Sequence, residues 1–181
     1  MTEDPQHIKY LAHRKELNGD FIDQTVDGHL RETAVSAESF CQSMPWAKWA
    51  YMAGLWHDIG KYSDAFQRRI RGSKERADHS TPGALLASNV FSDKMNFENL
   101  IGRILGYGIA GHHTGLPDGN SVDETCLNSR LLRANFDFSP CPPEIFHNLV
   151  INILDPSLFF ADCRNGGLHH GEEGVSYFFS A

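Results

Sequence analysis

Apolar residues recur every three or four positions along much of this chain, which is the spacing of an amphipathic helix. Residues 26–44 mix apolar and charged side chains in this way, and Pro45 follows as a stop signal. The same pattern predicts a helix over residues 46–59 and a third helix that begins after Ser63, its N-cap, and ends near Arg71. Further helices are expected at residues 80–91, 97–112, 124–135, 143–154 and 156–165.

Strand signals are weak by comparison. No run of alternating β-branched residues stands beside a convincing hairpin turn, although Asp27-Gly28 and Asp118-Gly119 could form turns. The expected fold class is therefore all-α, a compact helical bundle in which residues 1–181 form a single domain with its core at about residues 8–165. Residues 166–181 show no clear period and are expected to form a poorly determined tail, with an edge hairpin at 174–179 as the alternative.

Composition narrows the class of protein. The chain has 181 residues, 41% of them hydrophobic, which supplies a sizeable core. Its apolar stretches are too short for a membrane span and its acidic start lacks a signal peptide, so we expect a cytoplasmic protein with no membrane partner. The four cysteines form no CxxC pair, which argues against a zinc knuckle or a disulfide framework.

Charge and histidine content point in different directions. With 16 Lys and Arg against 23 Asp and Glu, the formal charge is −7, which is unfavourable for binding nucleic acid. The ten histidines, however, make the chain rich in ligands for transition metals. The sequence therefore directs attention to a metal site.

Several ionisable residues lie inside or at the ends of expected apolar helices, where burial is costly unless something pairs with them. Imidazole and carboxylate ligands without thiolates suit Mn, Fe, Co, Ni or Zn. Seven such candidate ligands are too many for one tetrahedral metal ion and are enough for two ions. A pair of metal ions is typical of enzymes that hydrolyse phosphodiesters. The candidate metal ligands are His29, His57, Asp58, His79, His112, His113 and Asp162.

Five blocks of sequence surround these candidates: YLAHRK at 10–15, GHL at 28–30, AGLWHDIGKYS at 53–63, DHSTPGA at 78–84 and AGHHTGLPD at 110–118. In this order they resemble the HD superfamily of metal-dependent phosphohydrolases. More narrowly, they resemble the HD nuclease domain of the CRISPR-associated helicase-nuclease of type I interference. The resemblance covers residues 8–118 and implies an HD-domain helical bundle with a dinuclear metal site.

The resemblance also implies a role for each residue. One metal would be held by His29, His57, Asp58 and Asp162, and Asp58 would bridge to a second metal held by His79, His112 and His113. Lys61 matches a lysine near the scissile phosphate, although a solvated helix-end cation is the alternative. His13 is expected behind the ligands, orienting one of them by a hydrogen bond. The acidic stretch of the family is reduced here to its final Asp, so Asp155 competes with Asp162 as the last ligand.

Function and partners follow from the same resemblance. It implies a DNA endonuclease or exonuclease that prefers single strands and uses two divalent transition-metal ions (Mn, Ni, Co or Fe, with Zn as another candidate). A helicase domain or subunit and an RNA-guided surveillance complex would be its partners. A basic run containing Arg68, Arg69 and Arg71 could contact DNA phosphates, although such runs are usually solvated helix faces.

Two alternatives remain open. The chain could be a small-molecule HD phosphohydrolase that acts on nucleotides or cyclic dinucleotides. It could also be a non-catalytic, metal-stabilised module that recruits a helicase or the surveillance complex. The Walker-type phosphate-binding motif GxxxxGK[ST] does not occur in the sequence, so we do not expect this chain to hydrolyse ATP with a Walker-type site.

Overall fold

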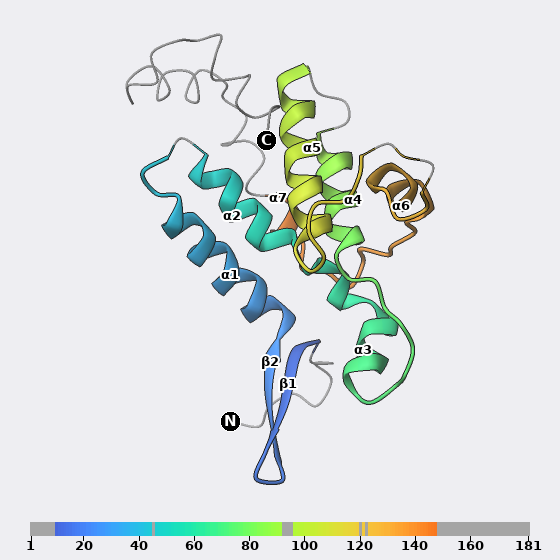
Figure 1. Ribbon diagram of the computed structural model, residues 1–181. Helices are drawn as coiled ribbons and strands as arrows, with labels where there is room; N and C mark the ends of the chain where they lie inside the picture. The colour runs from blue at the N-terminus through green and yellow to red at the C-terminus, as the bar shows by residue number, and fades with distance from the viewer. Residues whose placement is uncertain (1–9, 45, 92–95, 120, 122, 148–181) are drawn as a thin grey trace.

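The computed structural model of the protein describes residues 10–44, 46–91, 96–119, 121 and 123–147. A mostly helical body carries a two-stranded hairpin that projects from one end (Figure 1). The expected helix at 156–165, the tail at 166–181 and both candidates for the last ligand, Asp155 and Asp162, lie outside the described residues. Within these ranges, no helix has the length and apolar character that crossing a membrane requires.

The expected helices are present in the described part of the chain, with shifted ends. The first ends at Phe40 rather than at residue 44, and the second ends at Trp56, before a short 3-10 turn. Ser63 caps the third helix as expected, because its Oγ accepts a hydrogen bond from the N–H of Phe66 at 3.2 Å. The elements are α1 (Val26–Phe40), α2 (Ala47–Trp56), η1 (Ile59–Tyr62), α3 (Asp64–Ile70), α4 (Thr81–Val90), α5 (Asn96–Gly111), α6 (Leu127–Arg133) and α7 (Glu144–His147).

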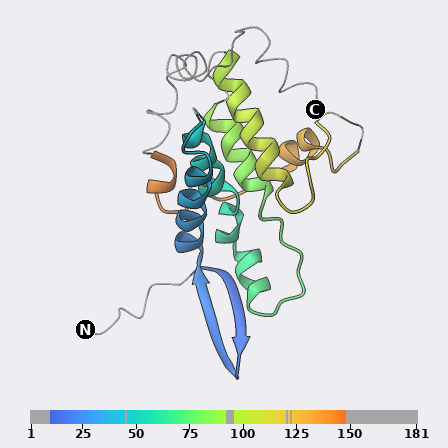
Figure 2. The same cartoon turned by 60° about the vertical axis from the view of Figure 1, so that its left-hand side comes forward.

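The expectation of an all-α fold is wrong for residues 11–25. Here β1 (Leu11–Leu17) pairs with β2 (Asp20–Thr25) in an antiparallel hairpin that extends away from the helices (Figure 2). Its turn is Asn18-Gly19, with φ angles of 56° and 90°, and both positive values are what a tight two-residue hairpin turn requires. The strands lack an alternating apolar pattern because most of the hairpin is exposed, so only the turn dipeptide signals it.

The core lies where the paired helices α1 and α2 meet the paired helices α4 and α5 (Figure 1). Trp56 is fully buried at this junction, and its indole N–H donates to the carbonyl of Ile145 at 3.0 Å, which ties α7 to α2. The fully buried core also includes Val26, Leu30, Ala34, Met52, Ile59, Ala87 and Phe91. This packing brings the C-terminal end of α2 beside the N-terminal end of α4, where the candidate site lies.

Gly83 permits that close approach. A Cβ atom on Gly83 would lie 2.0 Å from the carbonyl oxygen of Trp56 and 2.9 Å from the side chain of Ile109. Both distances are shorter than van der Waals contact, so any larger residue would push α4 away from α2. The absence of a side chain at this position therefore sets the separation of the two helices.

We predict that Gly83→Ala lowers the free energy of unfolding by about 1–3 kcal/mol or more, because the added methyl group overpacks the contact between α2 and α4. Gly108→Ala in α5 is the matched control, since a Cβ atom there has no neighbour within 4 Å. The control is expected to be neutral or stabilising by up to about 1 kcal/mol, because alanine favours the helix. Urea denaturation of both variants measures the difference, and equal stabilities would contradict the prediction.

Candidate metal centre

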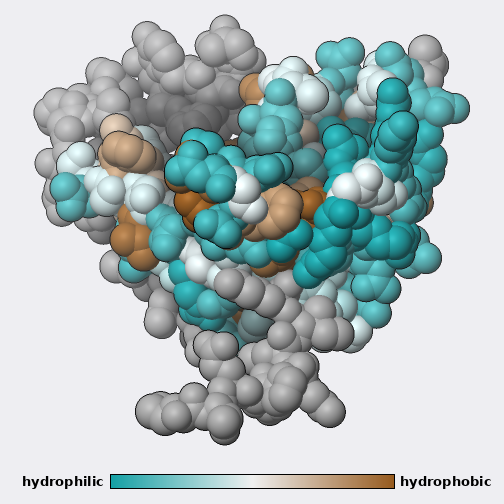
Figure 3. Space-filling model, turned by 90° about the horizontal axis from the view of Figure 1, so that it is seen from below, coloured by the Kyte–Doolittle hydropathy of each residue, from teal (hydrophilic) through white to brown (hydrophobic). Residues whose placement is uncertain are grey.

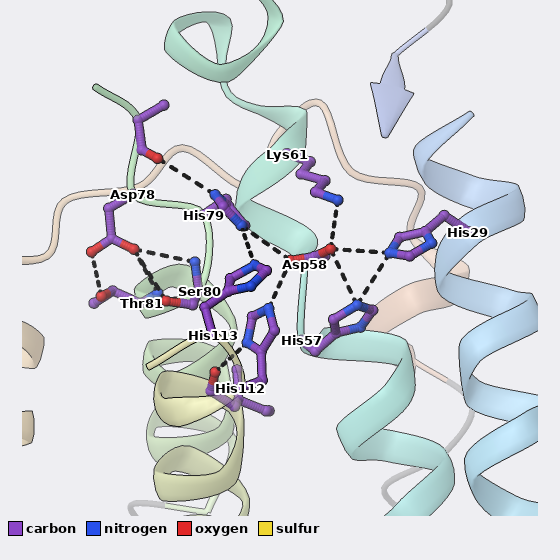
Figure 4. Close-up of polar contacts among 12 residues, drawn as sticks. His29, His57, Asp58, Lys61, Asp78, His79, Ser80, Thr81, His112 and His113 are labelled. Atoms are coloured by element: carbon purple, nitrogen blue, oxygen red, sulfur yellow. Dashed lines mark hydrogen bonds and ion pairs between the residues drawn. The ribbon is translucent and has the colours of Figure 1, made fainter. Parts of the chain in front are cut away.

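Asp58 lies between the end of α2 and η1 with its side chain only 3% exposed, in the middle of a cluster of basic groups (Figure 4). Burying a carboxylate in this way is costly unless cations or hydrogen-bond donors surround it. The surrounding side chains come from α1, the α2–η1 junction, the segment before α4 and the end of α5. They are His29, His57, Lys61, His79, His112 and His113.

The Oδ2 atom of Asp58 contacts one part of this set. His29 Nε2 lies 3.0 Å from Oδ2 and His57 Nε2 lies 3.2 Å from it. The two imidazole nitrogens are also 3.2 Å from each other. We refer to His29 and His57 as the Oδ2 cluster.

The Oδ1 atom lies next to different histidines. His112 Nε2 is 3.2 Å and His79 Nε2 is 3.6 Å from Oδ1, while His113 Nε2 lies 2.8 Å from His79 Nε2. We refer to His79, His112 and His113 as the Oδ1 cluster. Asp58 is therefore the shared residue of two groups of imidazoles, one beside each of its oxygens (Figure 4).

The ends of α2 and α5 orient their histidines in the same way. His57 Nδ1 donates to the carbonyl of Gly54, and His112 Nδ1 donates to the carbonyl of Ile109, each at 2.7 Å. In a continuing helix, each carbonyl would instead accept from the N–H four residues ahead. The imidazoles therefore help to end both helices, and the hydrogen on Nδ1 leaves Nε2 as the free ligand atom of the neutral ring.

This arrangement fits a bound cation. Neutral imidazole lone pairs that converge on a carboxylate oxygen repel it unless a proton or a metal ion lies between them. His112 lies at ion-pair distance from Oδ1, yet within the described part of the chain no group makes a well-directed hydrogen bond to that buried oxygen. A divalent transition metal would satisfy both the orphaned oxygen and the lone pairs, and the nitrogen and oxygen donor set suits such an ion.

The distances define two candidate ligand groups. The ligand atoms of Asp58, His79, His112 and His113 all lie within 4.8 Å of one another, and so do those of His13, His29 and Asp58. His13 was expected behind the ligands; the structure places it close enough to His29 and Asp58 to be counted with them. Asp162 belongs to the part of the chain that the structure does not describe.

The pKa shifts differ among the residues of the centre. Burial raises the pKa of Asp58, but the contacts of its oxygens with the imidazoles of His112, His29 and His57 outweigh burial and hold the pKa far below the usual range. Burial lowers the pKa of His79 and of His113, which favours the neutral rings that bind metals. For His112 burial also lowers the pKa, but its contact with Asp58 outweighs burial and leaves that pKa raised.

Lys61 is not a solvated helix-end cation. It is 3% exposed, and its Nζ lies 2.7 Å from Asp58 Oδ2 and 3.2 Å from His13 Nε2. The ammonium also lies 5.5 Å from the ring centre of Phe66, which packs edge-on against His79. That alternative is therefore wrong, and Lys61 belongs to the centre.

Gly60 brings the turn that contains Lys61 against the segment that contains His79. A Cβ atom on Gly60 would lie 2.6 Å from both the Cα and the carbonyl oxygen of His79. Only glycine allows these two backbones to touch, so His79 can reach Asp58 from a segment about twenty residues further along the chain. Gly60 thus contributes to the site without supplying a ligand.

The structure places Arg68 and Arg69 in the last turn of α3 and Arg71 directly after this helix. Arg68 pairs with Glu75 at 2.9 Å, and Arg71 donates to the carbonyl of Gln67 at 2.9 Å. Arg69 is exposed in the last turn of the helix. Neither Glu75, the partner of Arg68, nor Gln67, which Arg71 contacts, is a candidate metal ligand.

Arg130 is a residue near the site that the sequence pattern did not identify. Its guanidinium hydrogen-bonds to Ser80 and Thr81 beside His79, and to the carbonyl of Ala110 near His112. It lies in a short helix of mixed polar and apolar residues, and no motif distinguishes it from a surface arginine. Its role becomes visible only once α6 is seen to pack beside α4 (Figure 1).

The geometry can be compared with known proteins. The HD domain family matches residues 26–134, more than half of the chain. The chain belongs to the HD domain family. HD domains are generally metal-dependent hydrolases that bind divalent metals, and the histidine and aspartate cluster of this HD domain could bind such a metal. The match includes both clusters around Asp58 but not His13, and no curated protein matches the chain.

We predict that Asp58→Asn reduces the divalent metal bound by the purified protein, because the amide removes the charge that both clusters share while keeping the shape of the side chain. Calorimetric titration with Mn²⁺ or Ni²⁺ measures the loss. Asp64→Asn is the matched control, because Asp64 is an exposed residue in the first turn of α3. Equal metal binding by wild type and Asp58→Asn would contradict the assignment.

Proposed function

We propose that this HD domain is a divalent-metal-dependent nuclease, an endonuclease or exonuclease that cleaves the phosphodiester bonds of DNA and prefers single strands. The observation that supports this most directly is the division of the histidines between the two oxygens of Asp58. A single ion would need only one of these groups. Two groups beside one carboxylate are what a pair of ions requires.

The proposed ligands divide in the same way. His29, His57 and Asp58 Oδ2 would hold one ion, with Asp162 as a further ligand, and the Oδ1 cluster would hold the other. Bound Mn, Ni, Co or Fe, or Zn, would supply Lewis acidity and an activated water at the centre. The protein itself fixes the imidazoles through the carbonyls of Gly54 and Ile109, so little reorganisation is needed when a substrate binds.

Lys61 is proposed to contact the phosphate. Its ammonium lies beside Oδ2 and adds a positive charge where negative charge would develop during phosphodiester cleavage. His13, 3.2 Å from that ammonium, would position it or serve as an additional ligand. Both residues thus act on the same side of Asp58.

Exposure of the imidazoles supports access by a long substrate. The side chains of His29, His57, His79 and His112 are 15–22% exposed, whereas Asp58 beneath them is 3% exposed. Ligands that reach the surface from several elements suit a polymer lying across them. A nucleotide enzyme would more often surround its substrate in a closed pocket.

The partners are proposed on the resemblance of the sequence blocks. A helicase domain or subunit would deliver DNA that an RNA-guided surveillance complex of CRISPR type I interference has opened. A formal charge of −7 is consistent with weak DNA binding by the isolated domain and with delivery by such a partner. Figure 3 shows the molecule from below, at the end where α3 and the hairpin lie in Figure 1. The described residues on this face are mostly hydrophilic.

We predict that the metal-loaded protein cleaves a labelled single-stranded oligonucleotide in the presence of Mn²⁺, Ni²⁺ or Co²⁺, faster than the matching duplex. Asp58→Asn should lose this cleavage and Asp64→Asn should keep it. Gel electrophoresis of the products also separates internal cuts from terminal ones. Hydrolysis of nucleotides with DNA left intact would favour the small-molecule phosphohydrolase, and metal binding without any hydrolysis would favour the recruitment module.

We also predict that replacing Arg68, Arg69 and Arg71 together with alanine weakens binding to single-stranded DNA while metal binding is unchanged. Each lost phosphate contact should reduce the salt dependence of binding, by a slope of about 0.7 for single strands. Fluorescence anisotropy at several salt concentrations measures the slope. An unchanged affinity at low salt would identify these arginines as a solvated helix face.

A further inference from the structure

The guanidinium of Arg130 lies between the two chain segments that supply the Oδ1 cluster. Its Nη2 donates to Ser80 Oγ at 3.0 Å and to Thr81 Oγ1 at 2.7 Å, and its Nε donates to Thr81 Oγ1 at 3.0 Å. Its Nη1 donates to the carbonyl of Ala110 at 3.1 Å. One planar group on α6 therefore joins the start of α4 to the end of α5.

Both contacts lie next to histidines of the cluster. Ser80 directly follows His79 in the chain. The carbonyl of Ala110 is adjacent to that of Ile109, which accepts the hydrogen bond that orients His112. The contacts of Arg130 thus link the backbone that carries His79 to the backbone that carries His112.

Asp78 completes the connection on the His79 side (Figure 4). Its Oδ1 accepts hydrogen bonds from the N–H groups of Ser80 and Thr81, both at 3.1 Å, and its Oδ2 lies 3.8 Å from Arg130 Nη2. Asp78, directly before His79, is therefore bonded to the two residues that directly follow His79. Ionised Asp78 also offsets part of the positive charge of Arg130.

Arg130 differs in these respects from a surface arginine on the same helix. Its side chain is 18% exposed, whereas that of Arg133 is 54% exposed and pairs with Glu124. The contacts of Arg130 run in several directions within one plane, which a guanidinium can satisfy and an ammonium cannot. Arg133 therefore serves as an internal comparison.

We propose that Arg130 is a positioning residue that sets the spacing of His79 against His112 and His113, and so the affinity of the Oδ1 cluster for a divalent cation. The inference rests on the metal centre of the proposed function and is independent of the substrate that the protein cleaves. Removing Arg130 leaves the ligands in place but lets the two segments move apart. The Oδ2 cluster, which draws its histidines from α1 and α2, should not respond.

The test titrates Co²⁺ into the full chain and follows its visible absorption in two parent variants. His29→Ala retains the Oδ1 cluster, and His79→Ala retains the Oδ2 cluster. In the His29→Ala parent, Arg130→Ala is expected to weaken Co²⁺ binding about 10-fold, the usual scale for residues that support metal ligands, and Arg133→Ala to leave it unchanged. In the His79→Ala parent, Arg130→Ala should have no effect.

Two further measurements separate positioning from general stability. Arg130→Lys should weaken binding nearly as much as Arg130→Ala, because a lysine cannot join both segments, and millimolar guanidinium should restore binding to the alanine variant. Circular dichroism checks folding, and the lysine variant supplies the test if the alanine variant does not fold. Equal Co²⁺ affinity of the His29→Ala parent with and without Arg130, or an equal loss of affinity in both parents, would overturn the role of Arg130. Either result would leave the proposed metal centre unaffected. Failure of the His29→Ala parent to bind Co²⁺ would overturn that role together with the Oδ1 metal site.

Discussion

A buried, charged carboxylate costs free energy unless cations or hydrogen-bond donors surround it, and the packing around Asp58 meets that condition from every side. The first helix, the α2–η1 junction, the segment before α4 and the end of α5 each contribute a basic side chain within a few ångströms of its oxygens. Neutral imidazoles alone would not satisfy the carboxylate, because their lone pairs would face its oxygens. Bound divalent cations would satisfy it, and metal binding at this centre would then also stabilise the fold.

Two features of the backbone bring these basic side chains close to Asp58. Glycines at positions 60 and 83 let segments distant in sequence touch where any side chain would hold them apart. The histidines at the ends of α2 and α5 bond to carbonyls of their own helices, which ends each helix and aims each ring in a single step. The site is thus a product of how helices terminate and how closely they pack, and a short loop could not reproduce it.

Most of the helices and most of the residues around Asp58 could be predicted from the sequence, whereas the hairpin and Arg130 could not. Helical periodicity and the Ser63 cap located most of the helices in the described residues, and histidines at the ends of apolar helices indicated the cluster around Asp58. The hairpin was missed because its strands are exposed and lack alternation, although Asn18-Gly19 is a strong turn signal. Arg130 was missed because its importance depends on which helix packs beside α4, and periodicity carries no information on that contact.

The position of one carboxylate between two groups of histidines also has a thermodynamic meaning. The two oxygens of Asp58 belong to one rigid planar group, so a rotation that brings Oδ1 closer to the rings on its side also moves Oδ2 relative to the rings on the other. If each side holds an ion, as proposed, occupancy of one side would be linked to the affinity of the other, and the linkage would be equal in both directions. In the proposed two-ion centre, Asp58 would therefore couple the binding of one ion to the binding of the other, because both ions would share its single carboxylate.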